Sequence, residues 1–247
     1  MEDEESVTIF FACESGSRAW GFPSANSDYD VRFLYAHPRD WYLSIDLERR
    51  RDVIERPITD ALDVGGWDLR KALQLFRKSN PPLLEWLQSP IVYREETTVA
   101  ARFRDLLPVY YSPVKARYHY LHMAQGNARA YLKGDEIWLK KYFYVLRPVL
   151  AIQWIDADLG AVSMEFDVLV ERLITSPELK QAIADLLATK RAGDELGRGP
   201  RIAPISDFIE RELERLAAMK VEDNRPKPDV EILNQFFRDA LDELWPE

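Results

Sequence analysis

The most constraining feature of the chain is a short apolar segment followed by a glycine-serine turn and two spaced aspartates. Residues 7–12 form a continuous apolar run, which is typical of a buried β-strand. Gly16 and Ser17 follow this run, and Asp28 and Asp30 come next. A strand beginning at Asp28 would place both carboxylates on one face, because side chains two residues apart on a strand point the same way.

This order of residues has the elements of a site for a triphosphate and a metal ion. Two adjacent carboxylates repel each other unless a cation lies between them, and Mg²⁺ is commonly held by carboxylates together with substrate phosphates. Gly16 lets the backbone approach a ligand closely, and the Ser17 hydroxyl adds a hydrogen bond. Free N–H groups at a helix start near Arg18 suit a phosphate. The pattern therefore predicts Mg²⁺ or Mn²⁺ as cofactor, held in part by Asp28 and Asp30, beside a bound triphosphate.

The same residues resemble the signature of the DNA polymerase β superfamily of nucleotidyltransferases, which is Gly-Ser followed by Asp-x-Asp. Here the matching residues are Gly16, Ser17, Asp28 and Asp30. The longer stretches of sequence around these motifs resemble a narrower subgroup, the predicted bacterial nucleotidyltransferases associated with RNA repair and ligation. The segments that carry this likeness are 14–22, 27–33, 66–72, 79–87 and 140–148, within a region from about Val7 to Ile155.

The resemblance implies an α+β fold, with an α/β catalytic half built on a mixed central sheet and an all-helical C-terminal half. It also implies an enzyme that moves a nucleoside monophosphate from a nucleoside triphosphate to a hydroxyl acceptor. The acceptor stays open between an RNA 3′ end, as in RNA repair, a protein hydroxyl and a small molecule. A nucleotide-binding regulatory module without turnover is the alternative from another class, and the intact Asp-x-Asp pair favours the enzyme.

Three carboxylates usually share the metals of such a site, so a third acidic residue is expected on a neighbouring strand. Asp63 has strand-like residues on both sides, and family members usually place an acidic residue there. Asp68 fits the bare pattern equally well, but it stands where the N-cap of a helix belongs. We favour Asp63 as the third catalytic and metal-binding residue, with Asp60 as a weaker candidate.

Several basic residues are candidates for binding the triphosphate. Arg32 follows the two aspartates on the same strand face, where it either neutralises them as an ion pair or contacts a phosphate. Arg18 opens the turn after Gly-Ser. Lys141, with Lys140 and Arg147, occupies the second long helix expected in the helical half, and in related enzymes basic residues of that half face the triphosphate.

Hydrophobic periodicity divides the chain into a catalytic domain over residues 1–102 and a helical domain over residues 103–247. Strands are expected over 7–12, 28–35, 53–58, 61–64 and 91–93. The expected helices are 69–77 with Asp68 as cap, one beginning at Asn80-Pro81, 113–134, 138–155, 165–174, 177–190, 205–219 and 230–244. Residues 191–204 are expected to form a loop and 220–229 a linker.

Composition restricts the cellular compartment and the binding partners to be expected for the protein. One cysteine among 247 residues excludes an internal disulfide framework and favours the cytoplasm. Cys13, at the end of an apolar strand, is expected to be a core residue. The formal net charge of −9 argues against indiscriminate binding to nucleic acid but leaves an RNA end as acceptor open. No apolar run is long enough to span a membrane. The oligomeric state is not determined by the sequence.

Overall fold

A mixed five-stranded sheet carries the N-terminal region in the computed structural model of the protein, which describes residues 1–59, 61–192 and 196–246. β2 and β4 run parallel, whereas the other neighbouring strands run antiparallel. Each of the five predicted strands overlaps an observed strand, so the predicted mixed sheet is confirmed. In spatial order the strands are β3 (Val53–Glu55), β4 (Leu62–Asp68), β2 (Tyr29–Ala36), β1 (Thr8–Glu14) and β5 (Val92–Arg94).

Helices make up most of the remaining structure. Two of them, α4 (Leu69–Arg77) and α13 (Val230–Leu244), have the bounds that periodicity predicted. The others are α1 (Glu2–Glu5), α2 (Gly16–Ala19), α3 (Arg39–Tyr42), α5 (Pro81–Leu87), α6 (Val99–Asp105), α7 (Leu107–Tyr110), α8 (Pro113–Tyr131), α9 (Tyr142–Asp156), α10 (Phe166–Leu173), α11 (Pro177–Arg191) and α12 (Ala203–Ala218), with 3₁₀ turns η1 (Leu47–Arg49) and η2 (Leu139–Lys141).

The chain divides into two compact units that are not contiguous in sequence. The sheet unit comprises Met1–Gly16, Asp28–Ser112 and Asn224–Glu247, and the helical unit comprises Ser17–Ser27 and Pro113–Asp223. This division differs from the expected domains 1–102 and 103–247. A short N-terminal segment belongs to the helical unit, and the C-terminal helix belongs to the sheet unit.

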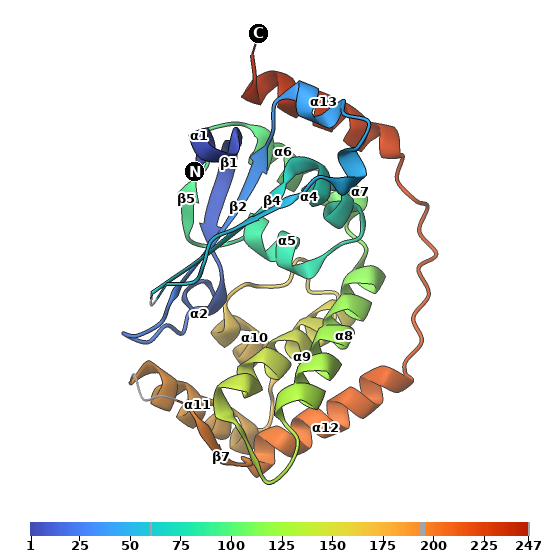
Figure 1. The fold of residues 1–247 in the computed structure, drawn as a ribbon. Helices are drawn as coiled ribbons and strands as arrows, with labels where there is room; N and C mark the ends of the chain where they lie inside the picture. The colour runs from blue at the N-terminus through green and yellow to red at the C-terminus, as the bar shows by residue number, and fades with distance from the viewer. Residues whose placement is uncertain (60, 193–195, 247) are drawn as a thin grey trace. The chain divides into compact units, whose positions relative to one another are not determined.

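One face of the sheet is covered by helices and holds the larger core of the sheet unit. Leu34 and Ala36 on β2 belong to a buried apolar cluster that also contains Phe236 and Leu241 of α13. Figure 1 shows α4 beside the strands and α13 beyond it. The amphipathic C-terminal helix therefore returns to the sheet unit because its apolar residues complete this core.

The opposite face of the sheet holds a smaller cluster that includes Phe33, Tyr35 and Ile54. Phe33 was expected to face a core and does so, whereas Tyr29 is exposed because it lies at the very start of β2. Gly66 pairs with Phe33 across the parallel strands, and a Cβ at Gly66 would lie 2.3 Å from the Phe33 ring. A glycine at this position leaves room for the aromatic side chain.

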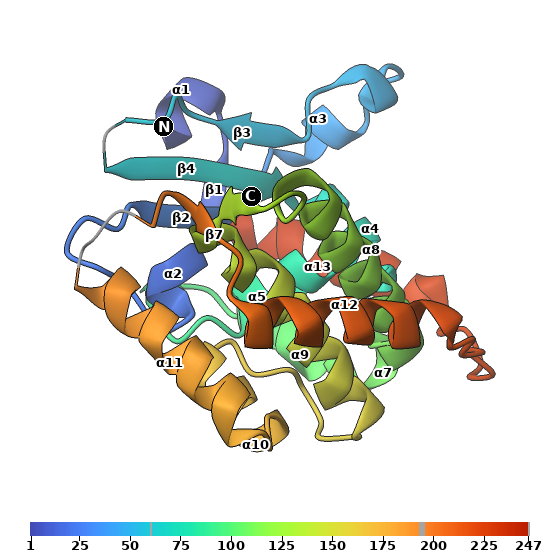
Figure 2. The same ribbon diagram turned by 90° about the horizontal axis from the view of Figure 1, so that it is seen from below.

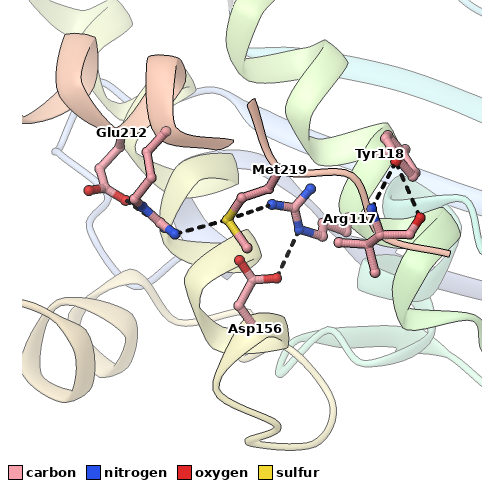
Figure 3. Close-up of polar contacts among 7 residues, drawn as sticks. Arg117, Tyr118, Asp156, Glu212 and Met219 are labelled. Atoms are coloured by element: carbon pink, nitrogen blue, oxygen red, sulfur yellow. Dashed lines mark hydrogen bonds and ion pairs between the residues drawn. The ribbon is translucent and has the colours of Figure 1, made fainter. Parts of the chain in front are cut away.

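The helical unit is tied together by buried polar contacts between its helices. Arg117 of α8 is 1% exposed, and its Nε donates to Asp156 Oδ1 of α9 at 2.9 Å. Its Nη2 also approaches Met219 Sδ, at the end of α12, at 3.6 Å (Figure 3). Gln153 Nε2 of α9 donates to Glu212 Oε2 of α12 at 2.8 Å. These contacts hold three helices of one unit in register with one another.

The helical unit also contains a short antiparallel ribbon, β6 (Glu136–Trp138) and β7 (Arg198–Pro200). The ribbon corrects two expectations. Residues 136–138 pair with β7, so the helix expected over 138–155 begins only at Tyr142, and Lys140 and Lys141 lie in the 3₁₀ turn before it. Part of the loop expected over 191–204 is strand β7, while its residues 193–195 lie outside the described part of the chain.

Candidate active site

The pairing of β2 with β4 places two aspartates side by side. In this parallel pair Asp30 stands opposite Asp63. Opposed residues of neighbouring strands point to the same face, so the two carboxylates project together from the sheet. Asp63, favoured from the sequence as the partner of Asp30, is therefore next to it in the structure.

The Arg32 guanidinium lies between these two carboxylates. Its Nη2 is 2.7 Å from Asp63 Oδ2 and 3.8 Å from Asp30 Oδ1. Its Nη1 donates to the Asp63 carbonyl oxygen at 3.0 Å. Of the two roles considered for Arg32, the structure shows the ion pair that neutralises the aspartates, and a contact with a phosphate stays a prediction.

Asp30 lies in a strongly acidic surrounding. Burial raises its pKa, and the negative charges of Glu14, Asp63 and Asp28 raise it further, against the opposing effect of Arg32. The backbone N–H of Asp30 donates to Glu14 Oε1 at 2.8 Å. Asp30 is thus held in place by its main chain while its side chain faces the candidate cation position.

Glu14 is a site residue that the sequence reasoning did not assign a role. Its residue is 0% exposed, and its carboxylate accepts hydrogen bonds from Asp30 N–H and from the Tyr93 hydroxyl of β5. The sequence feature that could have indicated its role is a charged residue at the end of an apolar strand. A buried carboxylate requires such partners, and here they connect β1 to both the site strand and an edge strand.

The packing of Asp30 requires a glycine at position 16, and the expected close approach of a ligand there stays a prediction. Its φ is +60°, in the left-handed region, and a Cβ there would lie 1.9 Å from Asp30 Oδ2. Ser15 N–H donates to the Asp30 carbonyl oxygen at 2.8 Å, which keeps the turn against β2. The space that any other side chain would fill is taken by the Asp30 carboxylate.

Ser17 and Arg18 belong to the helical unit, where both contact Ser27. Ser17 Oγ donates to Ser27 Oγ at 3.2 Å, and Arg18 Nη2 donates to the Ser27 carbonyl oxygen at 2.8 Å. These bonds close the loop between the turn and β2. The Gly-Ser motif thus spans the boundary between the two units, with Gly16 in one and Ser17 in the other.

Asp28 stands just before β2 and is exposed. Within residues 1–59, 61–192 and 196–246, no group of three or more His, Cys, Asp or Glu side chains is placed to hold a metal ion. The strand register places Asp63 beside Asp30, and Asp28 also lies near enough for its charge to raise the pKa of Asp30. The carboxylate oxygens of Asp28, Asp30 and Asp63 are donors of the kind that a hard divalent cation takes, and the Arg32 guanidinium contacts two of these side chains.

Asp68 caps helix α4, as predicted. Its Oδ1 accepts from Arg70 N–H at 2.8 Å, and its Oδ2 accepts from the Tyr42 hydroxyl at 2.6 Å. The residue is 1% exposed, and burial raises its pKa to about 6. Asp68 therefore has a complete structural role. Asp60, the weaker candidate, lies outside the described residues.

Lys141 contacts aromatic rings of the helical unit. Its Nζ lies 4.2 Å from the centre of the Tyr144 ring and 4.6 Å from that of Tyr131. Burial and the neighbouring Lys140 lower its pKa. Arg147, on α9, is buried with its guanidinium 5.0 Å from the Trp20 ring. Cys13 is buried, as expected, and burial raises the pKa of its thiol to about 12, which makes it a poor nucleophile.

Comparison with known protein families identifies the family of this chain. The model of the RlaP family, described as "RNA repair pathway DNA polymerase beta family", matches residues 1–239. The chain belongs to this family. The match reaches into both compact units and includes every predicted site residue, so the resemblance noted from the Gly-Ser and Asp-x-Asp motifs is confirmed.

Two individual proteins are similar to this member of the RNA repair pathway polymerase β family. "Uncharacterized protein YcgL" of Bacillus subtilis (strain 168) is 49% identical over 248 residues, covering 100% of this chain and 95% of the relative. A crystal structure of a nucleotidyltransferase-like protein from Exiguobacterium sibiricum 255-15 aligns with 99% of this chain and 86% of its own, at 10% identity and a TM-score of 0.32. The latter likeness is too weak to bear on the fold.

Among the described residues, no helix is both long enough and apolar enough to cross a membrane.

Proposed function

We propose that the chain is a divalent-metal-dependent nucleotidyltransferase that transfers a nucleoside monophosphate from a nucleoside triphosphate to the hydroxyl of an RNA end. The observation that carries the proposal is the pair Asp30 and Asp63, which flanks a position already filled by positive charge. Membership of an RNA repair pathway family supports RNA as the source of the acceptor.

In the proposed reaction the acceptor hydroxyl loses its proton to water and its oxygen forms a bond to the α-phosphorus, while the bond from that phosphorus to the bridging oxygen breaks and pyrophosphate leaves. Asp28, Asp30 and Asp63 would hold the metal, which when bound stabilises negative charge on the attacking and leaving oxygens. Glu14 fixes the main chain of Asp30, and Gly16 leaves room for its carboxylate. Ser17 and Arg18 would donate hydrogen bonds to the triphosphate.

Arg32 would serve in turn as an ion-pair partner of the aspartates and as a donor to a phosphate. Its contacts to Asp30 and Asp63 neutralise the carboxylates while no other cation is bound. A metal ion at the same place would compete with the guanidinium, which would then be available for a phosphate as a planar, two-pronged donor. The ion pair is partly exposed, so exchanging it for another partner costs little.

A direct test incubates the protein with each α-labelled nucleoside triphosphate, Mg²⁺ or Mn²⁺, and either cellular RNA or cellular protein. We expect label on RNA, and we expect Asp30→Asn and Asp63→Asn to abolish it. Asp40→Asn is the matched control, since Asp40 is an exposed aspartate of α3 in the same unit. Full transfer by the Asp30→Asn/Asp63→Asn double variant would refute the assignment.

A nucleotide-binding module without turnover is the second candidate, because the cation position between Asp30 and Asp63 is filled by Arg32. That function predicts nucleotide binding by calorimetry with no labelled product in any arm. Label on protein instead of RNA would keep the enzyme but change its acceptor to a protein hydroxyl.

A further inference from the structure

A cavity of about 360 Å³ lies in the sheet unit away from the aspartates. Tyr35 of β2 lines it, together with Glu5 of α1, Trp41 of α3 and Ile54 of β3. Figure 2 shows α1 and α3 flanking β3 at this edge of the sheet. Tyr35 is an odd number of residues from Asp30 on the same strand, so it faces the opposite side of the sheet, roughly 16 Å further along.

The Tyr35 hydroxyl is the first observation that points to a ligand. The residue is 0% exposed, and its oxygen has no hydrogen-bond partner among the described residues. Burial and the nearby Asp68, Asp52 and Glu5 raise its pKa, so the hydroxyl keeps its proton and can donate it. Buried hydroxyls are almost always hydrogen-bonded, and this one borders a cavity.

Positive charge around the cavity is the second observation. Arg50, Arg51 and Arg56 line it against two glutamates, Glu5 and Glu55, in a chain whose net charge is −9. The arginines are engaged in surface ion pairs: Arg50 with Asp46 at 3.3 Å, Arg51 with Glu55 at 2.8 Å, and Arg56 with Glu4 at 2.8 Å and with Glu5 at 2.9 Å. Such pairs contribute little to stability and exchange readily for a better anion.

The wall of the cavity is aromatic. The His37 and Trp41 rings stack with centroids 4.0 Å apart, and the Arg50 guanidinium lies 5.2 Å from the Trp41 ring. Burial lowers the pKa of His37, which favours the uncharged form of its ring. Guanidinium groups, aromatic rings and a hydroxyl donor are the chemistry by which proteins bind nucleotide phosphates.

We propose that this cavity binds a phosphate group carried by a nucleotide or by single-stranded RNA, with its oxygens accepting hydrogen bonds from the Tyr35 hydroxyl and from the guanidinium groups of Arg50 and Arg51. The site is separate from the Asp30–Asp63 pair. It therefore stands or falls independently of nucleotidyl transfer.

Calorimetric titration of the full chain tests the proposal with four probes: inorganic phosphate, AMP, a short single-stranded RNA with a 5′-phosphate, and the same RNA with a 5′-hydroxyl end. The Asp30→Asn protein is used throughout, so that turnover does not interfere. The Arg50→Gln/Arg51→Gln variant should weaken binding about tenfold or more, the effect of losing a charge-assisted hydrogen bond. Tyr35→Phe keeps the ring and should weaken binding several-fold.

Arg49→Gln is the matched control, because Arg49 belongs to the same run of three arginines but is exposed and is not one of the residues that line the cavity. It should bind as the parent does. Preference for the 5′-phosphorylated RNA, or binding of AMP alone, would each support the site and identify its source of phosphate. Equal binding of all probes by the Arg50→Gln/Arg51→Gln variant and its parent, or no binding by the parent, would overturn it.

Failure of the cavity proposal and failure of the proposed function give different results. Loss of labelled product in Asp30→Asn with intact binding at the cavity concerns only the aspartates. Loss of binding in Arg50→Gln/Arg51→Gln with intact transfer to a small hydroxyl acceptor, measured in the protein that retains Asp30, concerns only the cavity.

Discussion

Gly16 and the Asp30 carboxylate occupy adjoining space, so closely that a Cβ at Gly16 would lie 1.9 Å from Asp30 Oδ2. The glycine of the Gly-Ser motif and the second aspartate of the Asp-x-Asp motif are thus packed directly against each other. The two motifs are coupled by this contact whether or not a nucleotide is bound.

We therefore expect Gly16→Ala to destabilise the protein by about 1–2 kcal/mol, the cost of the left-handed backbone conformation, and by more where Asp30 cannot move. Gly126→Ala is the control, since nothing lies within 4 Å of a Cβ there and the position is inside helix α8. That variant should gain about 0.5–1 kcal/mol. Urea denaturation measures both.

A double-mutant cycle separates the backbone cost from the steric one. In an Asp30→Gly background the carboxylate is absent, so Gly16→Ala should cost less than it does in the natural chain. Equal costs in the two backgrounds would show that the contact between Gly16 and Asp30 does not constrain the turn.

Asp68 should make stability depend on pH. Its pKa of about 6 lies above the usual aspartate value, so between about pH 4 and pH 6 the folded state keeps a proton that the unfolded state has released. This contribution to stability is fully present at low pH and is lost as the pH rises through the folded pKa. A tenfold difference in proton affinity corresponds to about 1.4 kcal/mol, so the contribution is roughly 3 kcal/mol.

Asp68→Asn removes that titration while keeping a side-chain oxygen for the cap. The free energy of unfolding of the natural chain, minus that of Asp68→Asn, should fall as the pH rises from about 4 to about 6. Asp40→Asn, at an exposed position, should show no such trend. Asp68→Ala should lose about 0.5–2 kcal/mol as a missing cap, with transfer activity mostly retained.

Arg32 should compete with a metal ion for Asp30 and Asp63. Removing its charge in Arg32→Gln leaves the two carboxylates opposed, and Asp30 loses the charge that lowers its pKa. Added Mg²⁺ should therefore raise the melting temperature of Arg32→Gln more than that of the natural chain. Mg²⁺ present at about a hundred times its Kd would add about 2.7 kcal/mol to the free energy of unfolding.

The control for this experiment is Arg39→Gln, whose partner Asp242 forms an exposed ion pair elsewhere in the sheet unit. It should respond to Mg²⁺ as the natural chain does, and chelation should reverse every shift. If Arg32→Gln shows no greater response than Arg39→Gln, the space between Asp30 and Asp63 is not a cation site.

Lys141 is predicted to contact the triphosphate. Lys141→Met keeps an apolar stem against the Tyr131 and Tyr144 rings but removes the charge. We expect the KM for the nucleotide to rise about tenfold at low salt, as for one lost charge-assisted bond, and the difference to shrink as salt is added. Lys140→Met, on the exposed neighbour, is the control. Equal KM values for both variants at every ionic strength would leave Lys141 as a packing residue.

Local signals accounted for much of the fold. Helices α4 and α13 were predicted with their observed bounds because caps and apolar periodicity act within a few residues of each other. The Asp68 cap was predicted for the same reason. Tyr142 shows the limit of this approach, since the helix expected from 138 begins there only because 136–138 pair with a distant strand, as the register of Glu136 with Pro200 shows.

The sequence by itself determined the residue types of the site, its Gly-Ser and Asp-x-Asp order, and the strands and helices that carry them, because these depend on neighbours along the chain. Only the tertiary structure decided that Asp63 lies beside Asp30 and that Arg32 lies between them. It also decided that the buried Glu14 carboxylate accepts a hydrogen bond from the Asp30 N–H. Each of those relationships depends on the register between strands far apart in sequence. Shifting β4 by one residue against β2 would turn Asp63 to the opposite face.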